Sequence, residues 1–165
     1  MSTAATAVPL VRRELPVPPA ILARGGMVAP SYVDAFTLSG GVPRRTAEQW
    51  ARTILADVAG REGQVIWRVL LALRLREAPE RVAGWRVAYQ DDDWIRLEAR
   101  SWFMTGHLVV LADAQQLCLG TFVHYDRRVA AWIWEPLSRI HRRLAPGLLR
   151  DALAVHQSEA PSATP

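Results

Sequence analysis

The stretch GWRVAYQDDDWIRLEARSW, residues 84–102, decides the fold class of this chain. In its second half, Ile95, Leu97 and Ala99 alternate with charged side chains, which is the period of a strand with one buried and one solvated face. Its first half, residues 85–90, is also strand-like, and the three aspartates between the halves are typical of a tight turn. The stretch therefore predicts two antiparallel strands, 85–90 and 94–102.

The strand pattern continues beyond this hairpin. Two further apolar runs follow, at 107–111 and 117–125. Turn-like residues at 104–106 separate the first run from the hairpin, and those at 113–116 separate the two runs from each other. An earlier β-prone run, 32–38, ends at a Ser-Gly-Gly sequence. The spacings are short enough for antiparallel neighbours, so we expect one curved antiparallel sheet.

Two helices are expected between the first strand and the hairpin. The first begins at Thr46, because the threonine hydroxyl and the Gln49 side chain three residues later form a capping-box pattern. The second follows Gly60 to Gly63, where apolar residues recur at helical spacing up to Leu75.

A long C-terminal helix is expected over residues 128–155, with bends at Pro136 and Pro146, because proline inside a helix removes a hydrogen bond. One apolar stripe at helical spacing contains a single histidine: Trp134, Leu137, His141, Leu144, Leu148 and Ala152. This stripe is predicted to face the sheet. The fold class is therefore α+β, with a curved antiparallel sheet wrapped around the long C-terminal helix and two short helices after the first strand.

Length and composition indicate one domain, since 165 residues that are 50% hydrophobic suffice for one core and are few for two. Residues 1–30 are rich in proline and are expected to form a flexible arm without a regular hydrogen-bond ladder. The domain is expected to span 31–156, and the small polar residues of 157–165 are expected to be a disordered tail.

Composition also excludes several classes of function. No run approaches the roughly 18–20 apolar residues of a membrane helix, and the first nine residues lack the pattern of a secretory signal. A single cysteine, Cys118, between two leucines indicates a buried thiol and fits a cytoplasmic location. All twenty basic residues are arginines, and they alternate with carboxylates instead of forming a stripe, so no nucleic-acid partner is expected.

The order of strand, two helices, antiparallel strands and long final helix resembles the helix-grip fold of START domains and polyketide cyclases (the SRPBCC superfamily). Four segments are similar in sequence to a bacterial family of unknown function that is related to this superfamily. They are GWRV at 84–87, WIRLEA at 94–99, TFVHYDR at 121–127 and IHRRLAPGLL at 140–149. The similarity covers residues 30–155, about three quarters of the chain. It implies a sheet and helix enclosing an apolar pocket and identifies no catalytic residue.

His141 is the main catalytic candidate, because an imidazole on an apolar helical face can exchange protons with a molecule in such a pocket. Tyr89 or Tyr125 is its expected acid–base partner. The alternative for His141 is a core histidine that a backbone carbonyl or tyrosine hydroxyl satisfies.

The predicted ligand-binding residues share aromatic or apolar bodies with a few polar tips. They are Trp85, Trp102, Phe103, His107, Phe122, His124, Trp134 and Leu137. His107 and His124 lie on neighbouring predicted strands with Glu98 and Asp126 nearby, but no spacing motif supports a metal site, and neither a metal nor another cofactor is expected.

The sequence thus predicts a protein that binds a small hydrophobic molecule, polyketide-like or aromatic, and that cyclises, isomerises or dehydrates it without a cofactor. Two alternatives stay open: a carrier without catalysis, and a domain that docks onto a second copy of the chain or a reductase-like protein.

Overall fold

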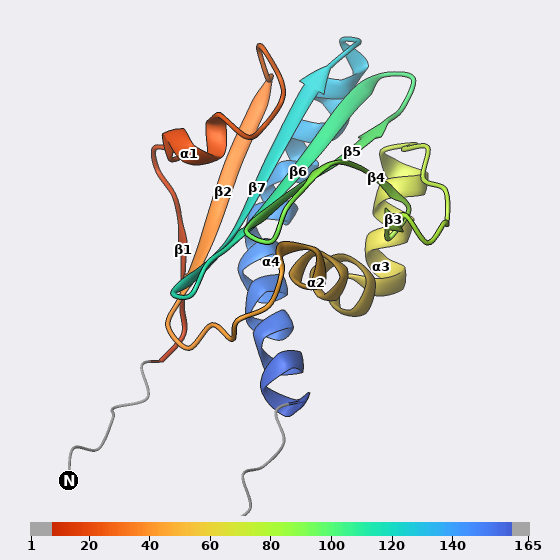
Figure 1. Cartoon of the computed structure of the whole chain (residues 1–165). Helices are drawn as coiled ribbons and strands as arrows, with labels where there is room; N and C mark the ends of the chain where they lie inside the picture. Colours follow the sequence, from red (N-terminus) through yellow and green to blue (C-terminus); the bar gives the residue numbers. More distant parts are fainter. Residues whose placement is uncertain (1–7, 160–165) are drawn as a thin grey trace, which may run out of the picture.

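The computed structural model describes residues 8–159, which form an open antiparallel sheet with helices on both faces (Figure 1). The elements in chain order are β1 (Leu10–Arg13), α1 (Pro19–Leu22), β2 (Tyr32–Ser39), α2 (Ala47–Arg52), π-helical η1 (Thr53–Val58), α3 (Gly60–Val65), π-helical η2 (Ile66–Leu70), β3 (Arg81–Val82), β4 (Trp85–Gln90), β5 (Trp94–Arg100), β6 (Met104–Ala112), β7 (Gln116–Tyr125) and α4 (Val129–Glu159).

The sheet has seven strands in the order β1-β2-β7-β6-β5-β4-β3, and every neighbouring pair is antiparallel. Each of the five predicted strands is present, and the predicted capping box of Thr46 and Gln49 is formed. The α+β class, the curved antiparallel sheet and the long C-terminal helix are therefore confirmed. Among residues 8–159, no helix combines the length and the apolar character needed to cross a bilayer.

The turn between β5 and β6 lies three residues earlier than the sequence predicts. The Ser101 hydroxyl accepts hydrogen bonds from the backbone N–H groups of Phe103 and Met104, which closes the turn over residues 101–103. As a result β5 ends at Arg100, and β6 begins at Met104, where a turn was expected.

The N-terminal segment differs from the expectation of an arm without a hydrogen-bond ladder. Leu10–Arg13 pairs with β2 as the edge strand β1, because this stretch between Pro9 and Pro16 contains no proline and keeps its backbone donors. At the other end, α4 continues to Glu159 through Pro136 and Pro146, so the first part of the predicted tail is helical. The rest of that tail, and the first seven residues of the arm, lie outside the described residues.

The two faces of the sheet carry different cores. The inner face holds the larger one, in which Leu97, Leu117 and Phe36 pack with Trp50 of α2 and Leu149 of α4. Figure 1 shows α4 running along this face and α1 on the opposite, outer face.

The outer face holds a smaller core, in which Ile21 of α1 packs with Val109, Cys118 and Phe122. The burial of Cys118 confirms the prediction for that thiol, and it raises the pKa of Cys118 to about 11. The missing side chain of Gly120 makes room for Ile21, since a Cβ at this position would lie 2.8 Å from the Ile21 side chain.

His107 fastens the segment after α1 to this outer face. Its Nδ1–H donates to the Gly25 carbonyl oxygen at 2.7 Å, and its Nε2 lies 3.7 Å from a Glu98 carboxylate oxygen. Burial lowers the pKa of His107, an effect that the Gly25 hydrogen bond and Glu98 only partly oppose. The folded protein therefore favours the neutral imidazole.

We predict that His107 makes the fold sensitive to acid. Because its pKa is lower in the folded than in the unfolded chain, its contribution to stability is present above the ordinary histidine pKa and is lost as pH falls through the folded-state value. His107→Asn keeps a donor near the Nδ1 position without titrating. Urea unfolding at pH 7.5 and pH 5.0 should show the free-energy difference between wild type and variant shifting in favour of the variant at the lower pH. An identical difference at both pH values would contradict this role.

Candidate functional site

A cavity of about 320 Å³ lies between the inner face of the sheet, the α3–η2 segment and α4. Its wall is mainly apolar and includes the indoles Trp67, Trp85 and Trp134. Ile140 and Leu144 also line it and are about half exposed, so the cavity opens to solvent along this side of α4. The volume is at the lower end of the range for small-molecule sites.

His141 stands in the wall of this cavity and is held by two strands. Its Nε2 lies 3.3 Å from Oδ2 of Asp34 on β2 and 3.2 Å from Oγ1 of Thr121 on β7. β2 and β7 pair with Asp34 opposite Thr121, so the register of the sheet places both oxygen atoms beside one imidazole.

This geometry assigns the donor of the contact. An ionised carboxylate only accepts hydrogen bonds, so Nε2 of His141 is the nitrogen that donates to Asp34. Among residues 8–159, Nδ1 of His141 has no hydrogen-bond partner. Nδ1 is therefore the ring nitrogen that the protein leaves unengaged, which is the arrangement of the histidine in the catalytic triad of hydrolases.

Asp34 is a buried carboxylate, with no exposed side-chain surface, and it has two donors. The second is the hydroxyl of Tyr32, which donates to Oδ2 at 2.5 Å. Burial, and then the hydrogen bond to Asp34, raise the pKa of Tyr32, so this phenol stays protonated and continues to donate. Arg142 of α4 donates to the Tyr32 oxygen at 3.4 Å and brings a positive charge to the group.

Six of the predicted site residues border this cavity: Trp85, His107, Phe122, Trp134, Leu137 and His141. The rings of Trp134 and His141 have centroids 5.7 Å apart, so an aromatic wall adjoins the imidazole.

The other two histidines predicted for the site, His107 and His124, have their side-chain contacts on the outer face, as does Phe122. His107 and Phe122 border the cavity, yet the His107 ring contacts Gly25 and the Phe122 ring packs with Ile21. His124 donates through Nδ1 to the Ala29 carbonyl oxygen at 3.1 Å. Strand alternation explains the division, because Thr121 and Val123 take the inner positions of β7.

The two predicted tyrosine partners lie away from His141. Tyr89 stacks on Trp94 with centroids 4.0 Å apart and donates to Asp91, and this hydrogen bond raises its pKa. Tyr125 borders a separate surface hollow with Trp132, and burial raises its pKa. Tyr32, which the sequence interpretation passed over, is the tyrosine that the fold brings to the histidine.

Trp102 and Phe103 form the turn before β6 and do not line the cavity. Trp102 is 58% exposed, whereas Phe103 is buried in the inner core. Their rings contact edge to face, with centroids 5.0 Å apart.

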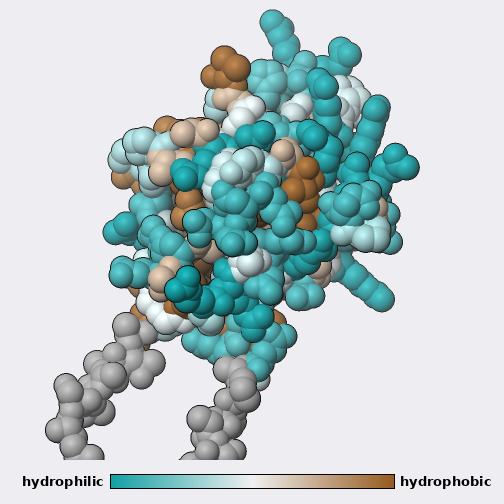
Figure 2. All heavy atoms as spheres, viewed as in Figure 1, coloured by the Kyte–Doolittle hydropathy of each residue, from teal (hydrophilic) through white to brown (hydrophobic). Residues whose placement is uncertain are grey.

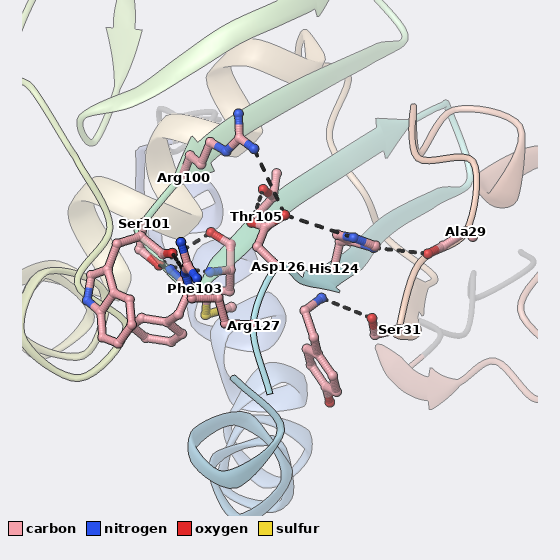
Figure 3. A network of polar contacts seen from close by, with 12 residues as sticks. Ala29, Ser31, Arg100, Ser101, Phe103, Thr105, His124, Asp126 and Arg127 are labelled. Carbon is pink, nitrogen blue, oxygen red and sulfur yellow. Dashed lines mark hydrogen bonds and ion pairs between the residues drawn. The ribbon is translucent and has the colours of Figure 1, made fainter. Parts of the chain in front are cut away.

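Figure 3 shows a polar cluster around Asp126 at the end of β7. Its carboxylate accepts from the Thr105 hydroxyl at 2.7 Å and lies 3.9 Å from His124 and 4.0 Å from Arg100. His107 pairs with Glu98 instead, so the two histidines do not share a carboxylate. Within the described part of the chain, no three histidine, cysteine or acidic residues are grouped to hold a metal ion.

Sequence reasoning missed Asp34, Thr121 and Tyr32. The available signal was the carboxylate of Asp34 within an otherwise apolar or hydroxyl-bearing β-prone run, since a charge in a predicted buried strand requires a partner. The alternation of β2 gives Tyr32, Asp34 and Phe36 one face, which the structure identifies as the inner one.

Comparison of the chain with known proteins identified no similar protein. No protein-family model matches the chain, and searches of curated proteins and of solved structures found no match.

Proposed function

We propose that this chain is a helix-grip protein that binds a small, mainly apolar molecule in the cavity and moves a proton on it with His141. The observation that carries the proposal is the Asp34–His141 pair in the wall of a cavity that is otherwise mostly apolar. A buried acid that orients an imidazole is costly to place in a core without use, and perturbed polar groups converging on an apolar pocket are typical of active sites.

The proposed chemistry is general acid–base catalysis. The free Nδ1 of His141 takes a proton from a C–H or O–H group of the ligand, and the imidazolium that forms stays beside the Asp34 carboxylate. Return of this proton to another ligand atom completes an isomerisation or a cyclisation, and its transfer to a leaving hydroxyl group completes a dehydration with release of water. Thr121 and Tyr32 position the pair without contacting the proton that moves.

The aromatic wall supports a ligand with a flat or cyclic body. Trp67 and Trp85 contact edge to face with centroids 5.7 Å apart, and Trp134 adjoins the imidazole. Such rings contribute contact area and hold a planar ligand at a fixed distance from His141.

The cavity supports this proposal over the docking domain, but it does not distinguish an enzyme from a carrier. A docking domain calls for a filled core and a continuous exposed apolar patch, whereas the face in Figure 2 is mainly hydrophilic with isolated hydrophobic side chains. A carrier would use the same cavity, so it differs from an enzyme only in leaving the hydrogens of its ligand untouched.

We predict that a small molecule co-purifies with the protein at a 1:1 ratio. Native mass spectrometry followed by denaturing extraction measures its presence and mass. Leu137→Trp, which fills the cavity, should lower the bound fraction severalfold because the added ring occupies the ligand volume. The matched control is Leu22→Trp, at an exposed position of α1 outside the cavity, and it should keep the wild-type occupancy. Equal occupancy in both variants would contradict binding in this cavity.

We further predict that the protein exchanges one ligand hydrogen with solvent. The extracted molecule is incubated with protein in deuterium oxide, and deuterium uptake is followed by mass spectrometry. His141→Gln should slow uptake by about 10²–10⁴-fold, the usual contribution of a general base. Asp34→Asn should also slow it, because the ring loses its orienting acceptor, while the exposed control Asp57→Asn should not. Uptake at the wild-type rate in His141→Gln would contradict the role of His141. Uptake with the wild-type protein no faster than without protein would leave the carrier function in place of catalysis.

A further inference from the structure

The charges in the cavity wall all have one sign. Glu62 of α3 and Asp151 of α4 are the charged side chains that line it, apart from its histidines, and none of the chain's twenty arginines does so. The protein as a whole carries a formal net charge of +4, so the cavity is locally opposite in sign to the molecule. A small molecule that enters meets carboxylates and no cation.

Both carboxylates are free to take a partner. Glu62 and Asp151 are exposed, and within residues 8–159 neither forms an ion pair within 4.0 Å. By contrast, Glu48, Glu98 and Asp126 each lie within that distance of an arginine.

Indole rings also line the cavity, and the ring of Trp67 packs against the helix segment that carries Glu62. A Cβ built on Gly63, the residue after Glu62, would lie 3.2 Å from the Trp67 ring, and Trp67 contacts Trp85 edge to face. The face of an indole attracts a cation, and a carboxylate attracts it as well. Two independent features of this wall therefore favour positive charge.

The cavity also has polar groups at two separated places along α4. His141 and Asp151 are ten residues apart, about 15 Å along a helix, and Leu144 and Leu148 line the wall between them. This spacing suits a ligand whose charged group lies at Asp151 while its apolar body extends toward His141.

We infer that the ligand is an apolar amine, bound as its ammonium cation between Glu62, Asp151 and the indole of Trp67. The inference rests on the proposed function, because it names the chemical class of the molecule that the cavity takes. The ammonium group interacts with the two carboxylates at the mouth, and the ring body fills the apolar space beside Trp85 and Trp134.

Three probes with one ring system test this: 2-(1-naphthyl)ethylamine, 2-(1-naphthyl)ethanol and 1-naphthylacetate, titrated into the full chain by calorimetry at low ionic strength. The amine should bind about tenfold more tightly than the alcohol, as expected for two partly exposed ion pairs, and the acetate most weakly. The preference should shrink as salt is added, because these charges face solvent.

Variants assign the preference to the two carboxylates. Glu62→Gln combined with Asp151→Asn should bring the affinity for the amine to that for the alcohol and leave the alcohol unchanged. Glu80→Gln combined with Asp92→Asn makes the same change in net charge at exposed positions outside the cavity, and it should retain the full preference.

The outcomes separate the two proposals. Binding of the alcohol without a preference for the amine, or tightest binding of the acetate, overturns the amine assignment and leaves the cavity function standing. A preference that survives loss of both carboxylates also overturns the assignment. Failure of all three probes to bind overturns the proposed cavity function and the amine assignment with it.

Discussion

The burial of one carboxylate, that of Asp34, constrains the arrangement around it. A charge without solvent contact must be paired, and its partners come from β2 itself and from α4. His141 reaches it only if α4 lies along the inner face at one particular height, and Thr121 supports the same ring only if β7 pairs with β2 in the observed register. Strand pairing, helix position and ring orientation are therefore linked through the partners of a single buried carboxylate.

That contact lies beside unfilled space. α2 and the adjacent η1 pack closely against the sheet and α4, whereas the α3–η2 segment stands further out and leaves the cavity between itself and the sheet. The apolar residues of α4 therefore serve two purposes: Ala145 and Leu149, outside the predicted stripe, complete the core, while Leu144 and Leu148 of the stripe form a wall that a ligand can contact. Stability and binding are divided between neighbouring positions of one helix.

The sequence was sufficient for elements whose pattern is strictly periodic. Ile95, Leu97 and Ala99 specify a strand and its buried face, and the apolar residues at helical spacing specify the helix α4. The predicted stripe is only partly the buried face of α4, because Leu144 is 52% exposed while Ala145 and Leu149 beside it are buried. Pattern could not say which face of β6 and β7 is the inner one, because apolar side chains occupy both faces of these central strands. His107, on β6, was therefore expected at the ligand and lies instead beneath the N-terminal segment. Asp34 was missed because its importance depends on a contact with His141, 107 positions away in the sequence.

The pairing of β2 with β7 also has a consequence for how the chain assembles. Strands β3 to β7 follow one another as hairpins and need only short loops to meet, whereas Tyr32 pairs with Val123 across about ninety residues. Closing so long a loop is entropically costly and slow, so we expect β1, β2 and α1 to join a meander that has already formed. During synthesis β2 leaves the ribosome before β7, so it would then remain unpaired until β7 has been made. Until the two strands pair, the edge of β7 is an unpaired strand at which two nascent chains can associate.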